Sequence, residues 1–110
     1  MDKSEGEIQA DICRYLDMLN DIEYSVTNAS SKTNIYRKRR KSATKTGWPD
    51  IVGVLGPIGR FFAIECKNAR GKLSEEQRYI LGKLQRRGAL VIVGHSVGEV
   101  ADQLNKVLHA

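Results

Sequence analysis

Two short β-rich runs separated by a four-residue turn constrain this chain more than any other feature of its sequence. The runs are residues 50–55 and 60–67, and the Gly-Pro-Ile-Gly sequence at residues 56–59 is typical of a hairpin turn. Both faces of the two runs carry apolar residues, which is typical of strands that lie inside a sheet. The pattern therefore predicts an antiparallel pair of strands in the middle of a larger sheet.

Apolar periodicity on either side of this hairpin predicts three helices and two further strands. The expected helices cover residues 5–20, 75–87 and 97–108, and the expected strands lie near Tyr24 and over residues 89–93. A strand, helix, strand crossover favours parallel pairing of its two strands. We therefore expect an α/β fold with a central mixed β-sheet flanked by helices, formed as a single domain over residues 1–110.

The charges are placed unevenly along the chain, whose formal net charge is +5. Residues 32–45 contain no acidic residue, and their basic residues are Lys32, Arg37, Lys38, Arg39, Arg40, Lys41 and Lys45. This basic block has two interpretations, a solvated loop without a partner or a surface that binds a polyanion. The block alone does not decide between them.

The sequence also indicates the cellular location of the protein and the redox state of its cysteines. No apolar run is long enough for a signal peptide or a membrane span, so we expect a cytoplasmic protein. Cys13 and Cys66 lie in separate apolar segments and lack the close spacing of a zinc site or a disulfide framework. Both are expected to be reduced thiols.

The hairpin brings two acidic residues together. If its turn is centred between Pro57 and Ile58, residues whose numbers sum to 115 face each other, so Asp50 faces Glu65 with Cβ atoms about 5 Å apart. Two carboxylates in a buried sheet repel each other and need a compensating positive charge. Lys67 lies on the same strand face as Glu65, and a hard cation such as Mg²⁺ or Mn²⁺ also prefers carboxylate oxygens. The pattern therefore predicts a metal site suited to phosphodiester hydrolysis.

These residues resemble the PD-(D/E)xK signature of a nuclease superfamily. Pro49 and Asp50, followed by the Glu-Cys-Lys sequence at residues 65–67, match that signature. The chain is similar, more narrowly, to the VRR-NUC domain, the virus-type replication and repair nuclease. Further matching features are Glu7 with Gln9, the Gly-Trp-Pro-Asp sequence at residues 47–50, Gln77, and Gly88 before the final strand. The resemblance implies a restriction-endonuclease-like core.

The resemblance also implies a wider site around Asp50 and Glu65. It suggests Glu7 as an additional metal ligand, the backbone carbonyl of Cys66 as another, and Gln77 as a catalytic polar residue. Both outer residues have a structural alternative, because Ser4 with Glu7 and Ser74 with Gln77 have the form of helix capping boxes.

The resemblance finally implies a function. We expect a Mg²⁺- or Mn²⁺-dependent DNA endonuclease that is specific for branched DNA, like phage or bacterial Holliday-junction resolvases, and that forms a homodimer. The DNA backbone would be held by Arg37, Lys38, Arg39, Arg40, Lys41 and Lys45. The alternatives are a non-catalytic nucleic-acid-binding module and a related nicking nuclease, restriction-type nuclease or exonuclease.

Trp48, the only tryptophan, is next to the motif and has two interpretations. Its ring could stack on a nucleobase or pack into the core at the start of the strand. Packing is the favoured interpretation, and Trp48 is left without a functional role.

Overall fold

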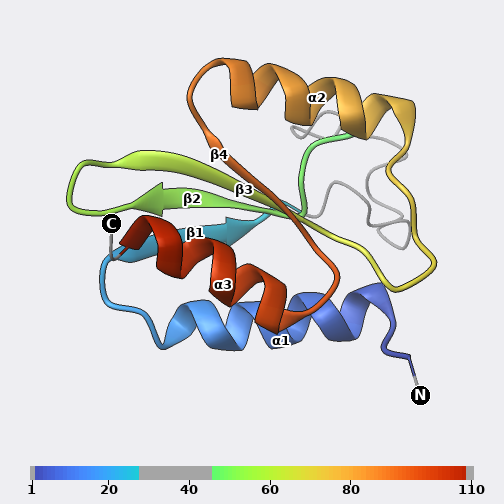
Figure 1. Cartoon of the computed structure of the whole chain (residues 1–110), viewed down its shortest axis with the longest axis horizontal. Coiled ribbons are helices and arrows are strands. Elements are labelled where there is room, and N and C mark those ends of the chain that lie inside the picture. The colour runs from blue at the N-terminus through green and yellow to red at the C-terminus, as the bar shows by residue number, and fades with distance from the viewer. Residues whose placement is uncertain (1, 28–45, 109–110) are drawn as a thin grey trace, which may run out of the picture.

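The predicted hairpin forms the middle of a four-stranded sheet (Figure 1). The computed structural model describes residues 2–27 and 46–108. Within these ranges β2 (Ile51–Leu55) pairs antiparallel with β3 (Arg60–Cys66). Ile51 faces Ile64, so the numbers of paired residues sum to 115, as the sequence predicts.

The outer strands make the sheet mixed. On one side, β1 (Ile22–Val26) pairs antiparallel with β2. On the other side, β4 (Leu90–Gly94) pairs parallel with β3, and α2 (Glu75–Arg86) forms the crossover between them. The order β1-β2-β3-β4 confirms the predicted central mixed sheet.

Helices cover the two faces of the sheet unequally. In Figure 1, α1 (Glu5–Asp17) and α3 (Val97–Leu108) lie together below the sheet, while α2 lies above it. The main core fills the space between the sheet and the α1–α3 pair. Its buried members are Ile8, Ile12, Leu16, Ile22, Ile51, Leu55, Phe62, Ile64, Cys66, Ile92, Val100 and Leu104. Because side chains alternate along a strand, Glu65 and Lys67 of the β3 segment fall on the opposite face, the face of α2.

Gly53 allows β1 and β2 to pair beside a buried ring. A Cβ atom at Gly53 would lie 2.0 Å from the backbone oxygen of Glu23 and 2.6 Å from the Phe62 ring. The Phe62 side chain therefore occupies the space that a side chain at position 53 would need. The centre of the sheet stays closely packed because the Phe62 ring fills this space.

The helices begin where the capping boxes predict, and the first ends early. Ser4 and Ser74 each accept a hydrogen bond from the backbone N–H three residues later. The helix expected to reach residue 20 ends at Asp17, because the N–H groups of Met18 and Leu19 donate to carbonyls three residues back and tighten the last turn. Among residues 2–27 and 46–108 there is no helix of the length and apolar character needed to cross a membrane.

Candidate active site

Three charged side chains are buried in the described part of the chain, and they are the three that the sequence singled out. Asp50, Glu65 and Lys67 are 7%, 2% and 8% exposed, and the described residues include no other buried polar or charged residue. Charged side chains are rarely buried unless they are paired or serve a site. The hairpin therefore concentrates the chain's buried charge at one end of β2 and β3.

Hydrogen bonds from two neighbouring segments hold Asp50. The N–H of Cys66 donates to Asp50 Oδ2 at 2.8 Å. Directly after β1, the N–H of Thr27 donates to the Asp50 carbonyl at 2.9 Å, and the Thr27 hydroxyl donates to the carbonyl of Pro49 at 2.7 Å. Asp50 is thus fixed on both its side chain and its backbone, just before β2 begins.

Of the two carboxylates, Glu65 has the less favourable electrostatic surroundings. Its Oε2 accepts a hydrogen bond from Gln77 Nε2 at 3.0 Å and lies 3.6 Å from Lys67 Nζ. Its Oε1 is buried and has no hydrogen-bond partner among the described residues. Burial and the nearby Asp50 carboxylate raise the pKa of Glu65 from 4.5 to about 8, against the opposing effect of Lys67. At this carboxyl, burial and the charge of Asp50 therefore outweigh the charge of Lys67.

Lys67 supplies positive charge without a close hydrogen bond to Glu65. Its backbone N–H donates to the carbonyl of Gly94 at 3.0 Å, which extends the parallel pairing of β3 and β4 beyond the end of β3. The buried stem fixes the ammonium near the acidic pair, but the 3.6 Å separation leaves its donors available to a further anionic group.

Gln77 combines the two roles that the sequence offered as alternatives. Its Oε1 accepts from the backbone N–H of Ser74 at 2.9 Å and completes the capping box of α2. Its Nε2 donates to Glu65 at 3.0 Å. The start of α2 is thereby tied to the acidic pair on the neighbouring strand.

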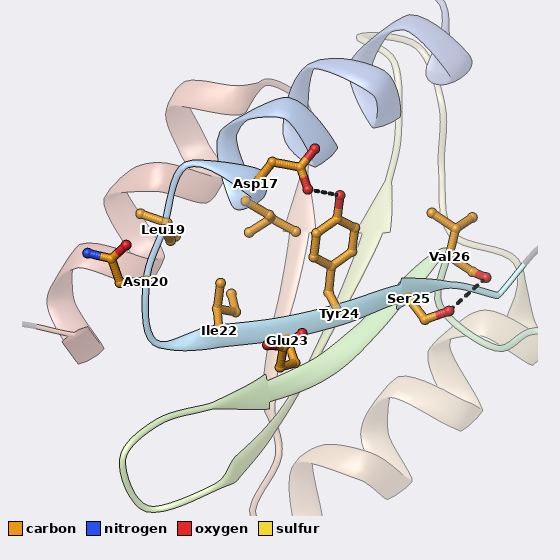
Figure 2. A pocket seen from close by; sticks show the side chains of 9 residues that line it. Asp17, Leu19, Asn20, Ile22, Glu23, Tyr24, Ser25 and Val26 are labelled. Carbon is orange, nitrogen blue, oxygen red and sulfur yellow. Dashed lines mark hydrogen bonds between the residues drawn. The ribbon is translucent and has the colours of Figure 1, made fainter.

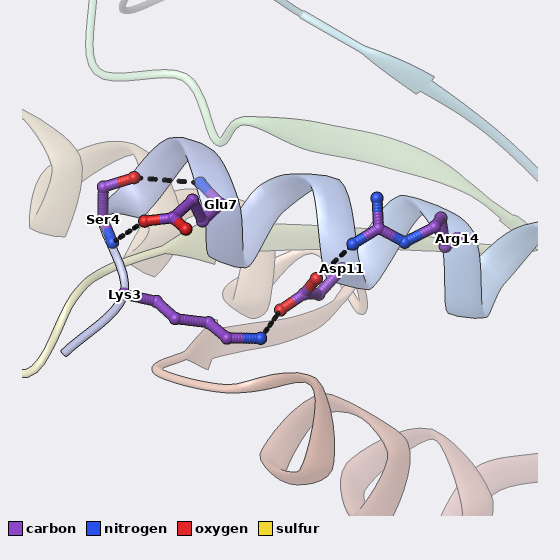
Figure 3. A network of polar contacts seen from close by, with 5 residues as sticks. All are labelled: Lys3, Ser4, Glu7, Asp11 and Arg14. Atoms are coloured by element: carbon purple, nitrogen blue, oxygen red, sulfur yellow. Dashed lines mark hydrogen bonds and ion pairs between the residues drawn. The ribbon is translucent and has the colours of Figure 1, made fainter. Parts of the chain in front are cut away.

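Glu7 has only its structural role among the described contacts. Its Oε1 accepts from the N–H of Ser4 at 3.0 Å, and Figure 3 shows this capping box beside the separate contacts of Asp11 with Lys3 and Arg14. The hydrogen bonds from Ser4 lower the pKa of Glu7. Within residues 2–27 and 46–108, no hydrogen bond or ion pair joins Glu7 to Asp50, Glu65 or Lys67, and its metal role stays a prediction.

The first turn of α1 offers another carboxylate, which the sequence analysis missed. A Cβ atom at Gly71 would lie 2.9 Å from Glu5 Oε2 and 3.1 Å from Lys67 Cδ, so both side chains pack against this glycine. The charge of Glu5 also contributes to raising the pKa of the Cys66 thiol. Residues 5 and 7 of a helix point in nearly opposite directions, so only the docking of α1 shows which of the two faces the site.

Cys66 presents its backbone to the site. Burial and the charges of Asp50 and Glu65 raise the pKa of its thiol well above the ordinary value, so the thiol stays neutral. Its N–H points to Asp50, and in an extended strand the N–H and carbonyl of one residue point to the same side. The Cys66 carbonyl therefore faces the Asp50 side of β3.

The donor set fits a hard divalent cation that keeps part of its water. Two carboxylates and a carbonyl are typical Mg²⁺ ligands, and the unpartnered Oε1 of Glu65 would gain a positive partner. In the described part of the chain, no three His, Cys, Asp or Glu side chains are placed to hold a metal together. Such a site would therefore depend on water and substrate oxygens for its remaining ligands.

A hollow on the surface lies away from these residues. It has a volume of about 590 Å³ and follows β1 and the end of α1 (Figure 2). There the Tyr24 hydroxyl donates to Asp17 Oδ1 at 2.6 Å, and this bond raises the pKa of Tyr24. None of the predicted site residues lines this hollow. The predicted DNA-binding residues, Arg37, Lys38, Arg39, Arg40, Lys41 and Lys45, lie outside the described residues.

Comparisons with known proteins agree with this fold. The sequence matches the VRR-NUC domain family over residues 4–98. A solved structure described as a VRR_NUC domain protein superposes with a TM-score of 0.69 at 16% identity, over 99% of this chain and 91% of that chain. No curated protein matches the chain. The likeness to the solved structure supports the fold, and the match to the family covers every residue of the buried trio.

Proposed function

This chain belongs to the VRR-NUC domain family of nuclease domains, and from that premise we propose that it is a divalent-metal-dependent DNA endonuclease. The observation that carries the proposal is the joint burial of Asp50, Glu65 and Lys67. A purely structural role explains it poorly, because buried like charges are destabilising and replacing them with apolar residues is often neutral or stabilising. Function gives a reason for the sequence to keep them.

Asp50, Glu65 and the carbonyl of Cys66 would hold Mg²⁺ or Mn²⁺. The ion would lower the pKa of a bound water and neutralise charge on the scissile phosphate. Of the two acidic residues in the first turn of α1, we favour Glu5 over Glu7 as the outer carboxylate, because Glu5 packs beside Lys67 while Glu7 is engaged by Ser4.

The remaining site residues act on the substrate and on the carboxylates. Lys67 would stabilise negative charge that develops on the phosphate, since its ammonium is held beside the acidic pair, 3.6 Å from Glu65 Oε2. Gln77 would keep Glu65 oriented, because it is itself fixed by the capping box of α2. Both tasks depend on rigid elements, which suits a site that must hold its geometry.

The expected substrate is branched DNA of the Holliday-junction type. Contacts from the basic block would fall on phosphates, and contacts of this kind carry no sequence information. Recognition would then depend on DNA structure, and a homodimer would present two active sites to opposing strands. Both the branched substrate and the homodimer are part of the proposal.

A cleavage panel tests the function. Linear, flapped and four-way DNA would each be incubated with the protein in chelator, with Mg²⁺ restored and with Mn²⁺ restored. We expect cleavage only with metal, and fastest on the four-way or flapped substrate. Faster cutting of linear ends would favour an exonuclease, and nicking of unbranched duplex would favour a nicking or restriction-type enzyme. Absence of cleavage of every substrate in both metals would contradict the enzyme.

Lys67→Ala separates the nuclease from a non-catalytic DNA-binding module. Loss of one group that stabilises the transition state lowers kcat by about 10²–10³-fold, so cleavage should fall by that amount while DNA affinity changes little. Lys72→Ala is the matched control, since Lys72 is an exposed lysine of the same loop. Circular dichroism would verify folding of both variants. Equal cleavage by Lys67→Ala and the control would remove Lys67 from the mechanism.

A further inference from the structure

A second hollow lies between Trp48 and one side of α2, outside the set of residues assigned to catalysis. Its volume is about 230 Å³, and it is lined by Trp48, Ile80, Lys83, Leu84 and Arg87. Pockets that enclose a drug-sized ligand span roughly 300–1,000 Å³. The size of this hollow therefore suits a single ring system.

The apolar lining of the hollow is not part of the main core. Trp48, Ile80 and Leu84 are half-buried, and none of them belongs to the cluster between the sheet and the α1–α3 pair or packs against it. The expectation that Trp48 packs into the core is therefore wrong for the main core. Three neighbouring apolar side chains remain partly exposed to water on this surface.

Two cations accompany this apolar lining. Lys83 Nζ lies 5.0 Å from the centre of the Tyr79 ring, and Arg87 Nη1 donates to the Lys83 carbonyl at 3.2 Å. None of the described residues that line the hollow is acidic. An aromatic and aliphatic surface beside two cations is complementary to a nucleotide, which carries a flat base and a negative phosphate.

The hollow is close to the candidate active site along two segments. Trp48 precedes Asp50 by two residues, and Gly47 packs closely against the backbone of Glu76 at the start of α2. Ile80, Leu84 and Arg87 follow Gln77 by three, seven and ten residues, which places them on one stripe of the helix. At 1.5 Å per residue they lie about 5, 10 and 15 Å from Gln77 along the axis. Since one strand of duplex DNA has one phosphate for about every 3.4 Å of helix axis, this is a distance of a few nucleotides.

We propose that this hollow binds one unpaired nucleobase of the substrate strand, a few nucleotides from the scissile phosphate. The base stacks on Trp48, and Lys83 and Arg87 contact the adjoining phosphates. The proposal rests on the proposed nuclease function and sharpens its substrate class, because a paired base cannot enter the hollow. The enzyme would therefore favour DNA with an unpaired nucleotide near the cut, as at a flap or an opened junction.

Tryptophan fluorescence tests the proposal directly, since Trp48 is the only tryptophan of the chain. The wild-type protein would be titrated in chelator, where it should not cut, with a flapped oligonucleotide and with the same molecule made abasic at successive flap positions. We expect saturable quenching by the intact flap and loss of quenching at one abasic position. Equal quenching by all abasic molecules, or none by any, would overturn the proposal.

Variants give a second readout by anisotropy of a labelled flap. Trp48→Leu should bind roughly 5- to 150-fold more weakly, the range that corresponds to loss of one stacked base, while Trp48→Phe should retain most of the affinity. Ile58→Ala is the control, because Ile58 is an exposed apolar residue in the hairpin turn at the other end of β2. Full affinity of a folded Trp48→Leu would contradict the stacked base.

The two proposals fail in different ways. Base-dependent quenching without cleavage in any metal would support the nucleobase site and contradict the nuclease. Metal-dependent cleavage without base-dependent quenching would support the nuclease and contradict the nucleobase site.

Discussion

At the scale of single residues, the buried Glu65 carboxylate is the feature that demands an explanation. It is 2% exposed, one of its oxygens has no partner among the described residues, and its pKa is raised to about 8. Burying a charged group costs free energy unless its partners compensate for the water that it loses. A buried carboxyl with a raised pKa is typical of a functional site, where the protein is less stable than it would be with an apolar residue at that position.

Glu65→Gln should therefore stabilise the metal-free protein. The amide removes a buried negative charge and provides an N–H₂ group that can donate a hydrogen bond to Asp50. We expect the free energy of unfolding at about pH 9 to rise by about 1–3 kcal/mol, measured by urea denaturation in chelator. The same variant should lose cleavage. A destabilised Glu65→Gln would show that the carboxylate is held for structural reasons.

The raised pKa of Glu65 also makes stability depend on pH. Between about pH 4.5 and pH 8 the folded protein binds a proton at Glu65 that the unfolded chain releases, so this stabilisation is present below pH 4.5 and is lost as the pH rises through about 8. The Tm of the metal-free protein should fall across this interval. The control is Glu65→Gln, whose Tm should fall less. Parallel curves for the two proteins would place the titrating group elsewhere.

The residues of the site differ in how far the sequence could predict them. Asp50, Glu65 and Lys67 follow from the symmetry of one hairpin and from the alternation of side chains, both of which are local. The placement of Glu5 depends on how α1 docks against the loop after β3. Glu5 and its neighbours in that loop are more than sixty positions apart in the sequence. No pattern within the first helix distinguishes Glu5 from Glu7 for this purpose.

At the scale of elements, the hairpin and the start of α2 together hold the site. Glu65 lies on β3 and Asp50 lies directly before β2, while Gln77 extends from the capped first turn of α2 to Glu65. The sequence predicted these elements well because capping boxes and turn residues mark their ends. The early end of α1 was missed because Leu19 continues the apolar spacing although the chain has already turned.

Two glycines test this description of the elements. Gly53→Ala would force a Cβ atom to within 2.0 Å of the Glu23 carbonyl and should lower the free energy of unfolding by roughly 1–3 kcal/mol or more. Inside α2, the Cβ atom added by Gly82→Ala would meet only the flexible end of Arg86 at 3.4 Å. This variant should raise the free energy of unfolding by roughly 1 kcal/mol. Thermal denaturation would measure both. A harmless Gly53→Ala would contradict the packing of Phe62 beneath β1 and β2.

At the scale of the whole molecule, the fold separates stability from chemistry. The face of the sheet covered by α1 and α3 contains the main core, whereas the opposite face carries the buried charges beside α2. The sequence predicted the mixed sheet from the crossover. It could not predict the hollow beside Trp48, because the two segments that form it meet only in the folded chain.

The central claim is that Asp50 and Glu65 are kept buried together in order to bind a divalent cation. Calorimetric titration of Mn²⁺ into the wild-type protein and into Asp50→Asn tests it most directly. We predict saturable binding to the wild type and an affinity for Asp50→Asn that is lower by about 10-fold or more, since even residues that only support metal ligands cost about 10–100-fold when changed. Equal Mn²⁺ affinity of the two proteins, or no binding to the wild type, would contradict the claim.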